Sequence, residues 1–136
     1  KSLCTLLLLI LLPFGAAQSA EFKLTGRTTW QLGQLMVNGI PFVLDEQTRF
    51  KDGLREDDLG GTWVDLEGVV EGELRLIREV EKLEEDDEMD LEGPVEQGRI
   101  WGYVTSDDSL VPFEGRWLEL ECKFDGMRLS RCREDD

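Results

Sequence analysis

The sequence predicts an all-β protein built from two related units. The prediction rests on segments of alternating apolar and polar residues, on turn-forming residues between them, and on a pattern that occurs twice. The pattern reads GTWVDLEGVVEG at 61–72 and GRWLELECKFDG at 115–126. Because a single β-hairpin is only marginally stable in water, a second copy would supply more strands to share a core.

The chain begins with the features of a secretory signal. An apolar stretch spans 3–12, Pro13 follows it, and mostly small residues occupy 15–20. The apolar stretch is too short to cross a bilayer as a helix, which needs roughly 20 residues. We therefore expect a cleavable signal peptide at 1–20, cut within 17–20, and a free mature protein that is periplasmic or secreted. An anchoring helix that stays in place is the alternative.

The charge balance limits the kind of partner. The chain has 136 residues, with 30 acidic, 15 basic and no histidine side chains, and a net charge of -15 at pH 7. Such an excess of negative charge repels nucleic acid phosphates and anionic lipid surfaces. We expect a small ligand or a protein partner, no nucleic acid binding and no stable membrane insertion. The length after removal of 1–20 suits one ordinary domain or two very small ones.

The first unit, assigned to 21–83, begins with a predicted hairpin. Asn38 and Gly39 stand between two apolar runs, and this pair is the strongest short signal for a type I′ turn because both residues tolerate positive φ. Pro41 has no backbone N–H, so the strand after the turn is expected to lie at a free edge. The segment 55–62 is expected to form a turn or a single helical turn.

A second hairpin is expected after this turn. Val64, Leu66 and Val70 alternate with mostly polar residues, and a period of two indicates a strand with one buried face. Gly72 then turns the chain, and 74–84 leads back. Apolar residues in 74–84 also fit a helical stripe, but the preceding hairpin favours a strand there.

An acidic segment at 84–90 separates the two units and is expected to be a solvated linker. Divalent cation binding is the alternative, but the segment lacks the spaced oxygen ligands and central glycine of a calcium loop. The second unit, 91–136, is expected to contain a strand pair in 91–104, a connection at 107–115 and a hairpin turn at 125–126.

The two copies of the pattern share residues along their length. Aligned without gaps, 61–72 and 115–126 have five identities in twelve positions. These are Gly61, Trp63, Leu66, Glu67 and Gly72, matched by Gly115, Trp117, Leu120, Glu121 and Gly126. When one residue is deleted from the alignment at the turn, Arg75, Leu76 and Arg78 also align with Arg128, Leu129 and Arg131. We expect an internal duplication with an abbreviated second copy, because nothing in it corresponds clearly to the Asn38-Gly39 hairpin.

Short motifs follow one another in a fixed order in the first unit. They are Val43-Leu44-Asp45, Thr48-Arg49-Phe50, Asp58-Leu59, Gly61, 63–68, Gly72-Glu73-Leu74 and Ile77. This order resembles the pattern V.VD..T.F, DL..G..V.VEG and G.L.A..I of a widespread family of small exported bacterial domains, catalogued as a domain of unknown function. The resemblance covers about 22–80 and, more weakly, 90–133.

The resemblance implies a small OB-like β-barrel in the periplasm or outside the cell, and it carries over no catalytic residue. Combined with the repeat, it gives the expected fold: all-β, with tandem small OB-like β-barrel units, the second abbreviated, after a cleavable signal peptide.

The absence of histidine argues against an enzyme. No Ser-His-Asp or Cys-His site can be assembled, and the commonest zinc, copper and haem ligand is missing. Carboxylate pairs such as Asp57 with Asp58 or Glu119 with Glu121 could act as acid and base in glycoside hydrolysis. With 30 acids in the chain such pairs arise by chance. We expect a non-enzymatic protein with no catalytic residue, metal or cofactor.

Cys122 and Cys132 are the cysteines outside the predicted signal peptide, and an oxidising compartment favours a disulfide between them. If 125–126 forms a two-residue turn, Cys122 faces Leu129, and Cys132 lies about 10 Å away, too far for a bridge. A bulge or a looser turn would be needed to join them. The alternative is a buried Cys122 and a free Cys132, since a reactive redox pair would need CxxC spacing.

The aromatic residues are the candidate ligand-binding residues. By strand alternation Trp117 lies on the polar face with Glu119 and Glu121, and Trp63 likewise lies among acidic neighbours. Such rings pack either against the other unit or a flanking loop, or else against a ligand such as a sugar or a cationic group. The full candidate set is Trp30, Trp63, Trp101, Trp117 and Tyr103.

These observations favour an exported, non-enzymatic binding module whose ligand the sequence does not identify. The alternative is a structural or envelope-stress protein whose acidic surface binds cations or a basic protein partner. Arg128, Arg131 and Arg133 form a basic strand that is expected to pair with acids at 119–125 or 84–90. A docking site for an anionic partner is the alternative for these arginines.

Overall fold

The computed structural model describes residues 20–83 and 87–135, and in these ranges the chain consists of strands, turns and short 3₁₀ helices. The first half contains β1 (Ala20–Gln31), β2 (Gln34–Val37), β3 (Ile40–Phe42), β4 (Arg49–Phe50), η1 (Glu56–Asp58), β5 (Trp63–Glu71) and β6 (Leu74–Lys82). The second half contains β7 (Glu88–Glu96), β8 (Arg99–Ile100), β9 (Tyr103–Val104), η2 (Val111–Phe113), β10 (Trp117–Phe124) and β11 (Leu129–Glu134). The all-β class predicted from the sequence is confirmed.

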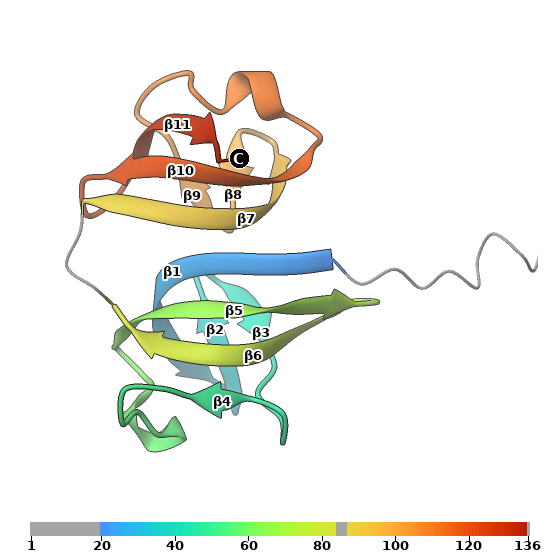
Figure 1. Ribbon diagram of the computed structural model, residues 1–136, viewed down its shortest axis with the longest axis vertical. Coiled ribbons are helices and arrows are strands. Elements are labelled where there is room, and N and C mark those ends of the chain that lie inside the picture. Colours follow the sequence, from blue (N-terminus) through green and yellow to red (C-terminus); the bar gives the residue numbers. More distant parts are fainter. Residues whose placement is uncertain (1–19, 84–86, 136) are drawn as a thin grey trace, which may run out of the picture.

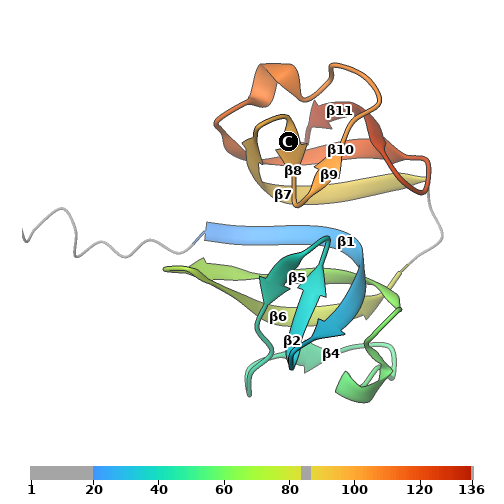
Figure 2. The same ribbon diagram turned by 180° about the vertical axis from the view of Figure 1, so that it is seen from behind.

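The long strands form one open sheet with the order β11-β10-β7-β1-β5-β6-β4. The two halves meet in the middle, where β1 and β7 run side by side (Figure 1) and pair at Lys23 and Glu92. The β2–β3 and β8–β9 segments branch from β1 and β7, and they lie behind the long strands in Figure 1 and in front of them in Figure 2. One face of the sheet is therefore covered by these segments.

Two parts of the prediction lie wholly or partly outside the described residues. The predicted signal peptide falls there except for Ala20, which begins β1. No helix in 20–83 or 87–135 has the length and apolar character needed to cross a membrane. The predicted acidic linker is shorter than expected, because β7 begins at Glu88 and Met89 is only 3% exposed. Residues 88–90 therefore belong to a strand, and Met89 contributes to the core.

The first predicted hairpin is confirmed. Asn38 and Gly39 have φ of 52° and 78° and join β2 to β3. Among the described strands, β3 pairs with β2 alone, so Pro41 lies on an edge strand as expected. The segment 55–62 contains the single turn of η1.

The second predicted hairpin is also confirmed, and the strand interpretation of 74–84 is correct for the nine residues of β6. In β5, Val64 and Leu66 are fully buried, whereas Val70 near its end is only half-buried. The register shifts at Glu67 and Gly68, where β5 lies against β6. This bulge explains why the apolar spacing in β6 departs from strict alternation and also fits a helix.

The second half contains a hairpin that the sequence did not reveal. Trp101 and Gly102 have φ of 48° and 82° between β8 and β9, so they form the counterpart of the Asn38-Gly39 turn. Tryptophan is unusual at such a position, because positive φ favours glycine and asparagine. The Asn38 side chain donates to the backbone oxygen of Trp101 (2.9 Å) and holds the two turns together.

Both halves make the same succession of strand pairs. In the first half β1 pairs with β2 and β5, and β5 pairs with β6. In the second half β7 pairs with β8 and β10, and β10 pairs with β11. Val43 then bridges Leu76 in parallel, and Thr105 bridges Leu129 in parallel. Leu76 and Leu129 are residues that the repeat aligns.

One hydrophobic core runs through both halves. The rings of Phe22, Phe42 and Trp101 lie 5.3–5.7 Å apart, so an aromatic cluster joins the first half to the second. A Cβ on Gly93 would lie 2.3 Å from the indole nitrogen of Trp101. Glycine is required at Gly93 because the Trp101 ring packs directly on this part of β7.

A disulfide joins Cys122 in β10 to Cys132 in β11, with 4.1 Å between their Cα atoms. The connection between these strands is the four-residue segment 125–128, so the expected two-residue turn is wrong. The register also shifts between Glu121 and Lys123, which places two residues, Arg131 and Cys132, opposite Cys122. The looser turn and the bulge together bring Cys132 within bonding distance.

Candidate functional site

The uncovered face of the sheet carries acidic side chains directly opposite one another. Four cross-strand pairs consist of two acids: Asp65 with Glu81, Glu67 with Glu79, Asp90 with Glu121, and Glu92 with Glu119. Like charges in such positions repel and weaken a sheet. Lys23 lies between the halves, 3.4 Å from Glu67 and 3.6 Å from Glu119, and offsets part of this charge.

Two of these carboxyls, Glu67 and Glu92, have raised pKa values. Partial burial and the nearby Glu119 and Glu21 carboxylates raise the pKa of Glu92. Burial and a hydrogen bond with Glu79 raise the pKa of Glu67 against the opposing effect of Lys23. Both acids therefore take up protons more readily than ordinary glutamates, chiefly because burial disfavours their charged form.

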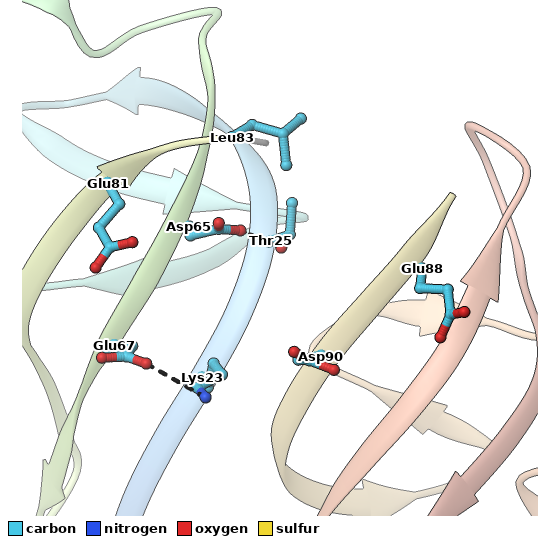
Figure 3. Close-up of a pocket in the computed structure, with 8 residues that line it drawn as sticks. All are labelled: Lys23, Thr25, Asp65, Glu67, Glu81, Leu83, Glu88 and Asp90. Carbon is cyan, nitrogen blue, oxygen red and sulfur yellow. Dashed lines mark hydrogen bonds and ion pairs between the residues drawn. The ribbon is translucent and has the colours of Figure 1, made fainter. Parts of the chain in front are cut away.

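A groove opens where β1 and β7 separate beyond their pairing point. Its first part, which we call the acidic hollow, has a volume of about 260 Å³ (Figure 3). It is lined by Lys23, Thr25, Asp65, Glu67, Glu81, Leu83, Glu88 and Asp90. Five of these eight residues are acids, and Figure 3 shows Glu88 and Asp90 on one wall with Asp65 and Glu67 on the other.

The groove continues into an apolar hollow of about 370 Å³. This part is lined by Thr25, Trp63, Leu83, Glu88, Met89, Phe124 and Gly126, so it shares three residues with the acidic hollow. The rings of Trp63 and Phe124 come from different halves, and their centroids lie 5.8 Å apart with planes tilted by 55°. The groove thus places an aromatic pair beside a cluster of carboxylates.

Trp63 differs from the other tryptophans in its hydrogen bonding. The indole N–H groups of Trp30, Trp101 and Trp117 each donate to a backbone oxygen, at 3.1, 2.8 and 2.9 Å. Within the described residues, the indole N–H of Trp63 has no acceptor, and the side chain is 37% exposed. Trp63 can therefore donate a hydrogen bond to a ligand without breaking a bond within the chain.

Two of the predicted ligand-binding residues belong to the core. Trp101 and Tyr103 are 6% and 5% exposed, so neither forms part of an exposed platform. The Tyr103 hydroxyl donates to the backbone oxygen of Thr25 (2.8 Å), and burial raises its pKa to about 12. Strand alternation could not reveal this, because burial of these rings depends on contact with the first half.

The two other candidates are partly exposed but lie outside the groove. Trp30 lines a separate depression near η1 and donates to the oxygen of Leu59. Trp117 donates to the oxygen of Glu21, and its ring meets Trp101 edge to face at 6.0 Å. Of the five candidates, Trp63 alone lines the groove, where it belongs to the apolar hollow.

Sequence reasoning missed several groove residues. Alternation along 117–124 predicts Phe124 on the buried face of its strand, together with Leu118, Leu120 and Cys122. Its half-buried position at the end of β10 lets it meet Trp63. Leu83 and Met89 lie at the borders of the segment predicted as a linker and gave no signal of a site.

Other charged candidates have structural partners. Of the three arginines predicted to pair with acids, Arg133 pairs with Glu121 and, at 3.5 Å, with Glu88, as expected. The carboxylate of Asp58 accepts from the backbone N–H of Arg55 (2.8 Å) and so stabilises the turn of η1. Asp57 and Asp58 thus both belong to the turn of η1.

One acidic cluster has the spacing of a metal site. Carboxylate oxygens of Asp90, Glu121 and Asp135 lie within 4.8 Å of one another. Asp135 reaches this position because its N–H donates to the oxygen of Glu119 (2.9 Å). Arg133 already pairs with Glu121, so the cluster is partly neutralised and gives no ground for a metal site.

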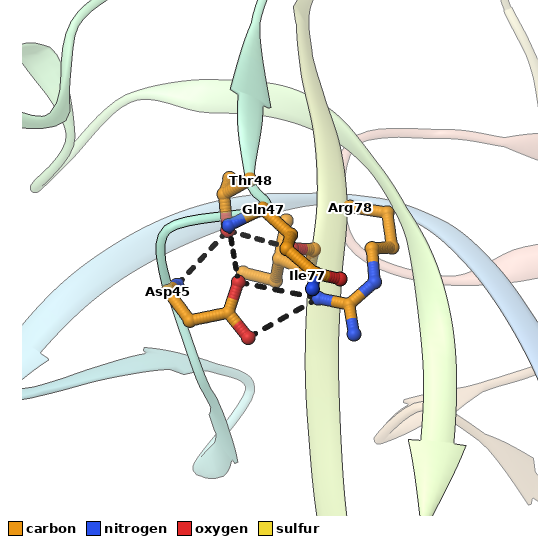
Figure 4. Close-up of polar contacts among 5 residues, drawn as sticks. All are labelled: Asp45, Gln47, Thr48, Ile77 and Arg78. Atoms are coloured by element: carbon orange, nitrogen blue, oxygen red, sulfur yellow. Dashed lines mark hydrogen bonds and ion pairs between the residues drawn. The ribbon is translucent and has the colours of Figure 1, made fainter.

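The D..T motif that carries the family resemblance forms a closed turn (Figure 4). Asp45 accepts from the backbone N–H of Gln47 (2.8 Å) and pairs with Arg78 at 3.2 Å. The Thr48 hydroxyl donates to the oxygen of Ile77 (2.6 Å) and accepts from the N–H of Asp45 (3.0 Å). The motif fastens the loop before β4 to β6 and takes no part in the groove.

Comparison with known proteins gives no relative. The chain matches no protein-family model, and neither the curated proteins nor the solved structures give a significant match. The resemblance to the exported bacterial domain family stays a prediction.

Proposed function

We propose that the chain is an exported, non-enzymatic binding module that holds its ligand in the groove between the halves. The observation that carries this proposal is the position of Trp63. Its exposed ring lies against Phe124, and its N–H has no acceptor among the described residues. An aromatic ring beside carboxylates suits a sugar or a cationic group.

The absence of catalytic activity is part of the proposal. The groove offers aromatic rings, carboxylates and the single ammonium of Lys23, which are groups that bind polar or charged ligands. The chain contains no histidine, the residue that most often acts as general acid or base near neutral pH.

Export is proposed on two grounds. The signal-like sequence at 1–20 is the first. The disulfide between Cys122 and Cys132 is the second, because such bonds persist in oxidising compartments such as the periplasm and the extracellular space.

We further propose that the halves are tandem OB-like units, the second abbreviated. The parallel bridges support this, because each joins the end of a three-strand meander to the last strand of the same half. Val43, directly after β3, bridges Leu76 of β6, so that β1, β2, β3, β6 and β5 are linked in succession and β5 pairs back to β1. The second unit is shorter because its β7–β8 pairing begins at Val95 and Ile100 and contains two residue pairs. The β1–β2 pairing of the first unit begins at Thr28 and Val37 and contains four residue pairs.

The proposal is tested by screening ligands against variants of single tryptophans. Neutral oligosaccharides, polyamines and basic peptides are added to the purified protein, and the change in Tm is measured. A true ligand should raise the Tm of the wild type and of Trp30→Ala but not that of Trp63→Ala. Trp30→Ala is the matched control because it removes a partly exposed indole outside the groove. If no ligand distinguishes these variants, the groove is not a binding site.

A second function is favoured by the four acid–acid pairs across the sheet. The protein would then be a structural or envelope-stress protein whose acidic surface binds cations or a basic protein partner. Calcium added at constant ionic strength would raise the Tm of wild type and Trp63→Ala equally. The rise would be smaller in Glu67→Gln and Glu92→Gln, which each remove one charge from the crowded face.

A further inference from the structure

We propose that the occupant of the groove is a basic peptide segment, with an arginine or lysine side chain laid against Trp63 and its charge directed to the carboxylates of the acidic hollow. This inference rests on the proposed function, because it names the ligand class of the same groove.

The first step is the recognition of one side chain. Trp63 and Asp65 lie on the same face of β5, two residues apart, which corresponds to about 7 Å along a strand. A guanidinium or ammonium over the indole ring is attracted by the ring electrons. The Asp65 carboxylate, which also accepts a hydrogen bond from the Thr25 hydroxyl, can pair with this cation at such a distance. The apolar walls formed by Leu83, Met89 and Phe124 would cover the methylene stem.

The second step is charge complementarity. The acidic hollow contains five carboxylates and one ammonium. Glu67 and Glu81 are each within ion-pair distance of a lysine, at 3.4 Å from Lys23 and Lys51. Asp90 is exposed and has no salt bridge with any described residue. Lys23 acts on Asp90 electrostatically without forming a salt bridge, so a cationic partner would find in Asp90 a carboxylate still open to a direct ion pair.

The third step concerns length. The two hollows share Thr25, Leu83 and Glu88, so they form one path from the aromatic pair into the acidic part. Their volumes of about 370 and 260 Å³ together exceed what one side chain fills. The acid–acid pairs continue onto β10, where Glu119 and Glu121 face β7. An extended segment with several basic residues matches this arrangement better than a single small cation does.

The fourth step is stoichiometry. The repeat aligns Trp117 with Trp63, but Trp117 donates to the oxygen of Glu21 and packs against Trp101. The equivalent position in the second half is thus occupied by contacts within the chain. One peptide should bind each protein molecule.

The test uses a fluorescein-labelled peptide of alternating arginine and glycine, with a matched peptide in which citrulline replaces arginine. Citrulline keeps the shape of arginine and removes its charge. Binding to the full-length mature protein is followed by fluorescence anisotropy at low and high salt, with spermine as a competitor. We expect one bound arginine peptide per protein, weaker binding at high salt, and no binding of the citrulline peptide.

Matched variants separate the groove from general attraction to a negative protein. Trp63→Ala should weaken binding about tenfold and Asp90→Asn combined with Glu81→Gln about threefold or more. The control combines Glu46→Gln with Glu73→Gln, which removes the same charge from exposed residues outside the groove. The control variant should bind as tightly as the wild type within about twofold.

Each other outcome overturns the inference. Equal losses in the groove variant and the control variant would mean attraction to the whole surface. Spermine that binds tightly while the peptide does not would mean a small-amine site. If an oligosaccharide binds through Trp63 and the arginine peptide does not bind, the peptide inference fails and the binding module stands. If no compound shows dependence on Trp63, both proposals fail.

Discussion

The indole N–H of Trp117 donates to the backbone oxygen of Glu21 at 2.9 Å, a hydrogen bond between residues 96 positions apart in sequence. Trp117 begins β10 in the second half, and Glu21 lies near the start of β1 in the first. Conversely, Trp63, at the start of β5 in the first half, contacts Phe124 of the second half. The two tryptophans that the sequence alignment matches thus each contact the opposite half, and within the described residues Trp117 alone of the two donates a hydrogen bond there.

Trp117→Phe should lower the free energy of unfolding by about 1 kcal/mol, because it removes this hydrogen bond and keeps most of the ring contact with Trp101. Denaturant titration measures the change. Trp63→Phe is the control and should have a smaller effect, since the Trp63 N–H has no acceptor in the described chain. Equal losses for the two variants would contradict the role assigned to Trp117.

Loss of the disulfide should destabilise the protein by about 2–3 kcal/mol, the value expected for a loop of this size. Cys122→Ala combined with Cys132→Ala tests this by thermal unfolding. Reduction of the wild type should add the mass of one hydrogen per thiol and lower the Tm. The double variant should be insensitive to the reductant, and a mass that does not change on reduction would disprove the bridge.

Glu92 should make the protein less stable at neutral pH than in mild acid. Its pKa is raised in the folded state by burial and by Glu119, so the folded protein binds this proton more tightly than the unfolded chain does. The stability that this proton contributes is complete below the ordinary glutamate pKa of about 4.3 and is lost as pH rises through the raised pKa. Glu92→Gln should therefore have a higher Tm than wild type at pH 7. The difference should shrink below about pH 4, and a lower Tm at pH 7 would refute the assignment.

Asp45 should contribute in the opposite sense. Its pKa is lowered by the backbone N–H of Gln47 and by Arg78, so its stabilising effect is present above the ordinary aspartate pKa and is lost as pH falls through the lowered value. Asp45→Asn should lower the Tm at pH 7 and have little effect at about pH 2. Glu46→Gln, an exposed neighbour, should leave the pH dependence unchanged. A Tm difference that persists at the lowest pH would mean that the carboxylate charge is not responsible.

The local elements of the fold could be predicted because their signals lie within a few residues of one another. Asn38 and Gly39 specify a turn whatever surrounds them, since the preference for positive φ belongs to these residues. The alternation of Val64 and Leu66 with acids specifies which face of β5 is buried. The strand interpretation of 74–84 needed the neighbouring hairpin, because a bulge breaks the alternation in β6.

The candidate site could be predicted only in part. Alternation placed Trp63 on the acidic face, but it also placed Trp117 there, and the sequence offers no reason to separate the two. Their difference arises from Glu21 and Phe124, which are distant in sequence and belong to the opposite half. Trp101 and Tyr103 looked equally available until contact with the first half buried them.

The sequence by itself determined the strand class, the first two hairpins and the excess of negative charge. The tertiary structure alone decided that β1 and β7 lie side by side, that the bulge brings Cys132 opposite Cys122, and that the groove has both an aromatic and an acidic part. The physical reason is that alternation fixes which face of a strand is buried but not which other strand it meets. The chemistry of the groove depends on that second choice, because its walls come from both halves of the chain.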